Sequence, residues 1–396
     1  MPMWDLLSPA ELEWKAVCRR FAAEAIAPRA REYDERNDFP RAVHERARAP
    51  EWGLLNTAIP EALGGRGMTH RALVVGGEEL AAACAPIAFT MGFNHGALRP
   101  VLEAGTEEQK GRFVRDLVGR GGYAAIALTE EGTSGSNLLA EVATRAVSTP
   151  GGYSIRGAKC MVGNGAVADL FVVLADTVVD GRRRGPSFFV VPRGAEGVRV
   201  GPNPLKIGFR ALTTPTVHLD DVEVPPENVL GAVGGAEDVL LRSLDYIRFG
   251  GASVILGIAV GALRDVVPWV EERRVYPGEP LVAKSHVQLD LADLYTQVQL
   301  VRLMLWRAAD LLDAGKPCST ETSMAKLAAS RLAVEATNRV VQMHGWRGLV
   351  ADDDRFRAEK RLRDARVTTV YEGTSEVQLL HIFRELRRSA QAGGDL

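Results

Sequence analysis

The chain changes its hydrophobic period twice, and these changes constrain the fold more than any other feature. From Ser8 to about Arg120, apolar residues recur every three or four positions, as in "SPAELEWKAVCRRFAAEAIAPRA", which is typical of amphipathic helices. From Gly121 to about Gly231, short apolar or alternating runs such as "LFVVLADTV" and "PSFFVVPR" indicate strands separated by turns. The helical period then returns and lasts to the end. The sequence therefore predicts a mainly helical protein with one central β unit.

These changes divide the 396 residues into three predicted domains, since a chain of this length exceeds what one core usually organises. Residues 1–120 form a helical domain, 121–232 a β domain and 233–396 a helical bundle. Wide apolar faces in "VQLDLADLYTQVQLVRLMLWRAADLL" favour a bundle that also buries surface against partners. In the first helix, Ser8, Pro9 and Glu11 predict an N-terminal capping box.

Composition narrows the class of protein. The formal net charge is −2, so no basic excess favours a nucleic-acid or membrane-surface partner. The four cysteines are scattered without metal-ligand spacing, which predicts reduced thiols and no metal site. The N-terminus lacks the pattern of a signal peptide, and the apolar stretch 250–263 is too short to span a bilayer. We therefore expect a soluble, cytoplasmic protein.

Several segments could carry chemistry, but each also has an ordinary structural interpretation. "ALTEEGTSGSN", residues 127–137, is rich in Gly, Ser and Thr, so it is either a surface loop or a cradle for a planar polar ring or pyrophosphate. Asp245 and Arg248 in "SLDYIRFGG" lie three apart on one helical face, where they form either a surface ion pair or part of a site. "VYEGTSEVQ" places Glu372 in a strand-like run that ends in Gly-Thr-Ser, either as a solvated turn residue or as a base facing a pocket.

In their order and spacing, these segments resemble the signatures of the acyl-CoA dehydrogenase family. The resemblance rests on "ALTEEGTSGSN", "IRGAKCMVGN", "LKIGFRALTTPTVHLDDVEVPPENVLG", "QMHGWRGL" and "VYEGTSEVQ", and it covers essentially the whole chain. It implies the three-domain architecture of that family: an N-terminal helical domain, a middle β-barrel and a C-terminal four-helix bundle. It also implies an FAD-dependent enzyme that removes two hydrogens from the α and β carbons of an acyl thioester, with Glu372 as the base for the α proton. A weakly acidic α proton requires a base in a dry pocket that raises its pKa. Some relatives carry the base at the position of Ile247, which cannot serve here.

The resemblance assigns further residues by position. Tyr371 and Gly373 would flank the acyl chain and the cofactor, and Asp245 and Arg248 would hold the carrier arm of the thioester. The cofactor positions, including a pair contributed by a neighbouring subunit (Arg273 with Tyr276), are Thr129, Ser136, Met161, Gly163, Arg273, Tyr276, Gln342, Gly345 and Thr374. Sharing of cofactor sites between subunits implies a homo-oligomer, in its simplest form a homotetramer built as a dimer of dimers.

Several positions depart from the family pattern, and three of them bear directly on the flavin site. Met161 replaces an aromatic residue beside the flavin, Gly163 replaces a hydroxyl residue, and Trp346 replaces a glycine. The first two changes remove shielding and a hydrogen bond, so we expect the reduced flavin to react with oxygen faster than is typical. The electron acceptor is then either an electron-transferring flavoprotein or oxygen.

The sequence leaves three functions to compare. The first is dehydrogenation of an acyl-CoA, and the second is dehydrogenation or oxidation of an acyl group carried by an acyl carrier protein. The third is a flavin-free scaffold that binds a partner.

Overall fold

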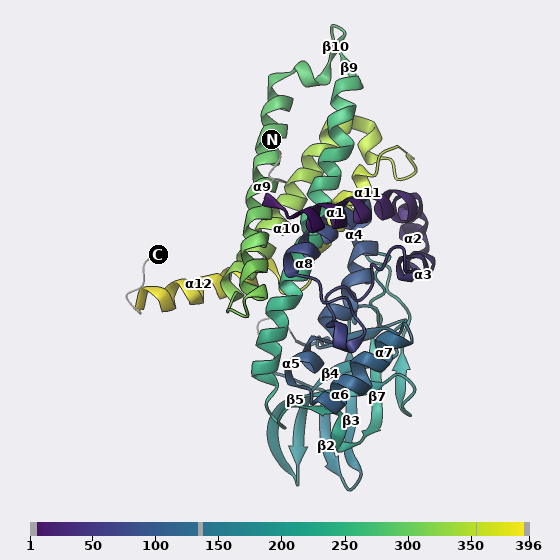
Figure 1. Cartoon of the computed structure of the whole chain (residues 1–396), viewed down its shortest axis with the longest axis vertical. Coiled ribbons are helices and arrows are strands. Elements are labelled where there is room, and N and C mark those ends of the chain that lie inside the picture. Colours follow the sequence, from purple (N-terminus) through teal and green to yellow (C-terminus); the bar gives the residue numbers. More distant parts are fainter. Residues whose placement is uncertain (1–5, 134–137, 354, 392–396) are drawn as a thin grey trace.

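The computed structural model describes residues 6–133, 138–353 and 355–391. Helices from both ends of the chain pack together, and the β domain lies at one end of the molecule, at the bottom of Figure 1. N-terminal helical, middle β and C-terminal helical domains therefore follow one another, as the sequence predicts. The helices before the β domain are α1 (Pro9–Phe21), α2 (Ala30–Arg36), α3 (Arg41–Arg48), α4 (His70–Ala97), α5 (Arg99–Ala104), α6 (Glu107–Lys110) and α7 (Asp116–Gly119).

Local sequence explains how α1 begins and why α4 is interrupted. The capping box of α1 is confirmed: Ser8 N donates to Glu11 Oε2 at 2.7 Å, and Glu11 N donates to Ser8 Oγ at 3.3 Å. Helix α4 leaves helical geometry at Cys84, where φ is −161° and ψ is 105°. Pro86 lies two residues further on, and a proline removes a helical donor and crowds the carbonyl four residues before it. That carbonyl belongs to Ala82, and it accepts instead from Nη2 of Arg361 at 2.8 Å.

The β domain is one sheet of eight strands. Its hydrogen-bonded order is β6-β7-β3-β2-β4-β5-β8, and β1 pairs with β4. Antiparallel pairing dominates, while β4 takes β1 and β2 as parallel neighbours. The strands are β1 (Ala124–Ala127), β2 (Arg145–Thr149), β3 (Gly152–Lys159), β4 (Leu170–Val179), β5 (Arg182–Pro192), β6 (Val198–Val200), β7 (Val217–Val224) and β8 (Val229–Leu230).

Strands β4 and β5 are apolar on both faces because both faces are covered. Val172 and Leu174 of β4 belong to a core shared with the N-terminal helices, whereas Phe171 and Val173 belong to a core on the opposite face. Successive side chains of a strand point to opposite sides, so a strand between two cores reads as a continuous apolar run. This accounts for the pattern "LFVVLA".

The C-terminal domain is a bundle of long helices. Helix α12 extends away from the body of the molecule, in yellow in Figure 1, and the β9–β10 hairpin lies at the end opposite the β domain. The elements of the C-terminal domain are α8 (Ala236–Glu272), β9 (Arg274–Val275), β10 (Glu279–Pro280), α9 (Ser285–Asp313), α10 (Ser319–His344), α11 (Ala358–Thr368) and α12 (Ser375–Gln391).

Two helical segments have the length and hydropathy of a membrane span. They are residues 70–104 and helix α8, and within them 78% and 83% of the most apolar window is buried inside the protein. The apolar stretch 250–263, which by itself is too short to span a bilayer, lies in the middle of the longer helix α8. Both segments are therefore buried like the core helices of a folded protein.

A buried ion pair connects the N-terminal and C-terminal helices. Arg302 of α9 donates from Nε and Nη2 to the two carboxylate oxygens of Glu78 on α4, both at 2.8 Å. The side chains are 5% and 1% exposed. Two parallel hydrogen bonds satisfy both groups in the interior, where either charge alone would be strongly disfavoured.

We expect Glu78→Ala to lower the free energy of unfolding by about 3–5 kcal/mol, because it leaves the Arg302 guanidinium buried without its carboxylate. Urea denaturation followed by circular dichroism measures the change. The control is Arg199→Ala, which removes an ion pair whose two side chains are both more than half exposed and should cost at most about 1 kcal/mol. Equal effects of the two substitutions would contradict this account.

Candidate active site

Glu372 lies in the turn between α11 and α12, so the strand-like interpretation of its sequence is wrong. Its φ is 56° and that of Gly373 is 87°, which places two consecutive residues in the left-handed region. A bulky residue adopts this conformation only where its surroundings hold it there. Gly373 is the one local sign of a turn, and the helices on both sides and the contacts below determine it.

Two buried side chains hold the turn. Nζ of Lys326, on α10, donates to the carbonyl oxygens of Thr368 and Gly373 at 2.9 and 2.8 Å. Nε2 of Gln378 donates to the carbonyl oxygens of Glu372 and Gly373 at 3.1 and 3.2 Å. The sequence analysis missed both residues, although Gln378 ends the motif "VYEGTSEVQ" itself.

The Glu372 carboxyl group is partly shielded from solvent. Its Oε2 is shielded from solvent and accepts no hydrogen bond from the described part of the chain. Burial raises the pKa of Glu372 to about 8, although the positive charges of Lys326 and Arg248 act in the opposite direction. Burial likewise lowers the pKa of Lys326 to about 8. A carboxyl group that is deprotonated near pH 8 is a stronger base than an exposed one.

Space for the carboxyl group depends on a glycine of α8. A Cβ atom on Gly251 would lie 1.7 Å from Oε2 of Glu372, whereas a Cβ on the neighbouring Gly250 would meet nothing within 4 Å. The carboxylate therefore occupies the volume that any other residue at position 251 would fill.

Glu372 faces a cavity of about 130 Å³ between α4, α8 and the β domain. This volume is comparable to the roughly 150 Å³ of an apolar cavity that accepts benzene. The lining is apolar apart from the carboxyl group and a few polar side chains, and it includes Phe89, Phe93, Ile126, Ile247, Gly250 and Gly251. Ile247, at the position where some relatives carry the base, is thus part of the wall.

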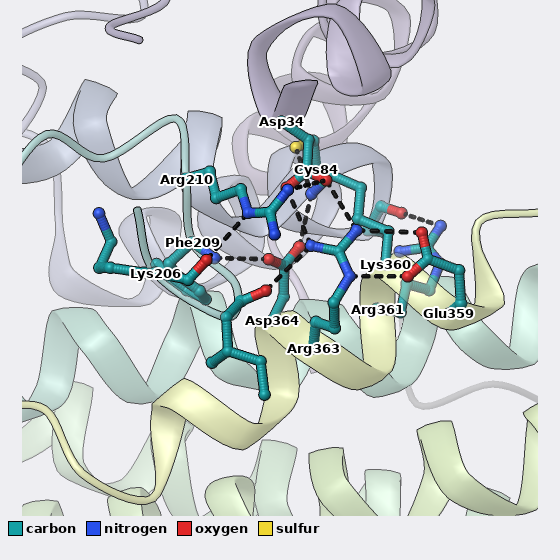
Figure 2. A network of polar contacts seen from close by, with 12 residues as sticks. Asp34, Cys84, Lys206, Phe209, Arg210, Glu359, Lys360, Arg361, Arg363 and Asp364 are labelled. Carbon is teal, nitrogen blue, oxygen red and sulfur yellow. Dashed lines mark hydrogen bonds and ion pairs between the residues drawn. The ribbon is translucent and has the colours of Figure 1, made fainter. Parts of the chain in front are cut away.

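An aromatic cluster forms one wall beside the base. The Tyr371 ring lies 5.2 Å from that of Phe89 and 5.4 Å from that of Phe209, measured between centroids. Figure 2 shows how Phe209 is fixed: its N–H donates to Asp364 Oδ1 at 2.7 Å, and Asp364 also accepts from Lys360. The Tyr371 hydroxyl is buried and has no hydrogen-bond partner among the described residues.

Asp245 and Arg248 do not form a surface pair. Arg248 is 6% exposed, and its Nη1 donates to Asp245 Oδ1 at 3.1 Å. Asp245 also accepts from the hydroxyl of Ser319. Burial lowers the pKa of Arg248, and Asp245 and Glu372 raise it, so this buried guanidinium is electrostatically linked to Glu372.

Three of the predicted cofactor residues lie together at the edge of the β domain. The amide of Cys160 donates to the carbonyl oxygen of Thr129 at 2.8 Å, which brings Thr129 beside Met161. Both are exposed, and Met161 has a φ of 54°. Gly163 is buried under a ring that also lines the cavity, since a Cβ on Gly163 would lie 2.3 Å from Cζ of Phe93. The ring of Phe93 thus fills the space that a hydroxyl side chain at position 163 would take.

A second set lies at the far end of the bundle, away from the β domain. Arg273 donates from Nη1 to the carbonyl oxygen of Met343 at 3.2 Å, beside Gly345. Tyr276, in the β9–β10 segment, is 93% exposed. The fold therefore separates Arg273, Tyr276, Gln342 and Gly345 from Thr129, Met161 and Gly163 (Figure 1).

Two further residues that the resemblance assigns to the cofactor, Thr374 and Ser136, are in neither of these sets. Thr374 caps α12, since its hydroxyl accepts from the amide of Val377 at 3.3 Å. Ser136 lies outside the described residues.

The whole chain matches the domains of one family. Acyl-CoA dehydrogenase N-terminal, middle and C-terminal domains match residues 8–120, 125–222 and 235–387. The chain belongs to the acyl-CoA dehydrogenase family. Homologous members of this family bind FAD and are oxidoreductases.

Individual relatives of the family cover nearly all of the chain. It is 35% identical over 376 residues to the mitochondrial short-chain specific acyl-CoA dehydrogenase of Mus musculus, covering 95% of this chain and 89% of that protein. It is 33% identical over 352 residues to subunit CarC of the caffeyl-CoA reductase–Etf complex of Acetobacterium woodii, with 89% and 91% covered. The solved butyryl-CoA dehydrogenase of Megasphaera elsdenii superposes with a TM-score of 0.89 at 29% identity, with 96% and 99% covered.

We expect Gly163→Ser to lower the midpoint of thermal unfolding, because the new side chain would be driven into the ring of Phe93. Overpacking of this kind costs about 1–3 kcal/mol. Adding Phe93→Ala should relieve part of this cost, so the two substitutions should couple in a double-mutant cycle. Gly194→Ser is the control, because a Cβ there would meet nothing within 4 Å. Strict additivity of the two changes would contradict the proposed contact.

Proposed function

We propose that the chain catalyses the FAD-dependent α,β-dehydrogenation of a short acyl thioester, most simply an acyl-CoA. The observation that carries the proposal is the Glu372 carboxyl group at the wall of a small apolar cavity, with a raised pKa and with Oε2 shielded from solvent. In this role Glu372 removes the α proton, and when bound, FAD accepts the hydride from the β carbon. The small volume of the cavity and the short-chain and butyryl relatives support a short acyl group.

The residues present fit a bound flavin. Thr129 and Met161 lie side by side at the edge of the β domain, next to the aromatic wall that borders the cavity through Gly163 and Phe93. These residues would hold the ring of the cofactor. The apolar lining excludes water, which keeps the base desolvated. Tyr371 and Phe89 would orient the acyl chain, and Asp245 with Arg248 would contact the carrier arm.

A shared cofactor site would explain why the second set of residues lies so far away. We propose that Arg273, Tyr276, Gln342 and Gly345 complete the cofactor site of a neighbouring subunit. Exposed apolar side chains on α9 and α12 support association, among them Leu289, Leu300 and Phe383. The homotetramer, like the cytoplasmic location, stays a prediction from the sequence.

The electron acceptor is proposed to be an electron-transferring flavoprotein, supported by similarity to CarC, a subunit of a complex with Etf. Oxygen is the alternative that Met161 and Gly163 favour. Anaerobic reduction of the enzyme followed by stopped-flow mixing with oxygen distinguishes the two acceptors. Slow reoxidation would exclude oxygen and identify the electron-transferring flavoprotein as the acceptor.

Glu372→Gln should keep the bound flavin and lose its reduction by substrate, by roughly 10²–10⁴-fold, because the amide cannot take up the α proton. Anaerobic bleaching of the flavin by butyryl-CoA, and by the same acyl group on an acyl carrier protein, measures the loss and identifies the carrier. In the wild type, the rate of reduction should rise as the pH passes about 8, where Glu372 loses its proton. The matched control is Glu376→Gln, which changes an exposed carboxylate four residues away. Full reduction in Glu372→Gln would place the base elsewhere, and a colourless wild-type protein would favour the binding scaffold.

Gly251→Ala should slow flavin reduction by at least about tenfold, since a shift of the base by about 1 Å can cost 10²-fold. The methyl group would displace the carboxylate, while Gly119→Ala adds the same group at the end of helix α7, outside the cavity and without a close contact. Similar rates in the two alanine variants would mean that Gly251 does not position the base.

A further inference from the structure

A second cavity, of about 440 Å³, lies between the N-terminal helices and the C-terminal bundle, away from Glu372. Four arginines from α1, α8 and the start of α11 line it together with two carboxylates. Its charged residues are Arg19, Arg264, Arg357, Arg361, Glu79 and Asp265. Four guanidinium groups against two carboxylates leave two positive charges in excess. Because the whole chain has a net charge of −2, this excess is a local property of the cavity.

Both carboxylates already pair with cations of the cavity. Glu79 accepts from Arg19 at 3.1 Å and from Arg264 at 2.8 and 2.9 Å, and it also accepts from Lys15. One carboxylate is thus shared among three cations. Asp265 accepts from Nε of Arg361 at 2.9 Å.

Arg357 has no carboxylate of its own within ion-pair distance in the described ranges. It donates from Nη2 to the carbonyl oxygen of Ala27 at 2.8 Å, which engages one of the five N–H groups of its guanidinium. The side chain is largely enclosed, and burial together with the neighbouring charge of Arg361 lowers its pKa. Burial and the neighbouring charge of Arg264 likewise lower the pKa of Arg19.

The arginines are also held in place without a ligand. Arg361 donates from Nη2 to the carbonyl oxygen of Ala82, which the interruption of α4 leaves without a helical donor. Room for this side chain comes from Gly261, since a Cβ there would lie 2.3 Å from Nη1 of Arg361. Guanidinium groups fixed before binding lose little freedom when they bind an anion.

We propose that this cavity is a binding site for a phosphate group, either free inorganic phosphate or the phosphate of a small ester. A dianion would balance the two excess charges, and guanidinium groups match the geometry of phosphate oxygens. Arg357 would be the main contact, with Arg264 and Arg361 on the neighbouring walls. The site lies outside the cavity that contains Glu372, so it does not depend on the function proposed above.

Isothermal titration calorimetry of the FAD-loaded enzyme with inorganic phosphate, and separately with glycerol 3-phosphate, tests the proposal. Saturable binding of either is expected, and Arg357→Gln should weaken it at least about tenfold, the effect of losing a hydrogen bond to a charged group. Tighter binding of glycerol 3-phosphate identifies an ester as the ligand, and equal or weaker binding identifies free phosphate.

The control is Arg355→Gln, two residues earlier, whose exposed side chain pairs with Glu272 and should leave the affinity unchanged. Arg264→Gln, on another helix, provides an independent variant and should weaken binding as well. Absence of heat with both ligands would overturn the proposal. So would equal affinity in the wild type and in both the Arg357→Gln and Arg264→Gln variants.

Discussion

The burial of one carboxyl group determines the arrangement of the site. Glu372 is in a turn whose backbone is left-handed at two residues, so the surrounding structure must hold that turn. Lys326 and Gln378 do this through the carbonyl oxygens of the turn, and Gly251 leaves the volume that the carboxylate fills. The raised pKa follows from the same enclosure. Fold stability and basicity at this position thus have a common physical origin.

The three domains supply different parts of this arrangement. The C-terminal bundle carries Glu372 and its supports, helix α4 contributes the aromatic wall, and the β domain provides the edge with Thr129 and Met161. Domain packing therefore creates the cavity, which no single domain contains. The buried pair of Glu78 and Arg302 fixes α4 against the bundle and so fixes two of the walls relative to each other.

The sequence predicted the architecture because hydrophobic period reports helices and strands directly. The resemblance also placed Glu372, Asp245 and Arg248 among the candidate site residues. In the structure Glu372 lines the cavity and Arg248 is buried, and their roles stay predictions. The sequence could not identify Lys326, Gly251 or Phe93, because their roles arise from contacts between segments that are far apart in the chain. The turn at Glu372 was misread as strand for the same reason: β-branched and aromatic neighbours favour a strand locally, and tertiary contacts override that preference.

The contact between Phe93 and Gly163 has a consequence for recombining this protein with its relatives. The two residues belong to different domains, yet the ring of Phe93 occupies the space that a side chain at position 163 would need. A chimera that imports a middle domain with a larger residue at position 163 would inherit a steric conflict with α4. Exchanging both residues together would preserve the packing between α4 and the β domain. The compatibility of two parental sequences therefore depends on this pair of residues rather than on either domain alone.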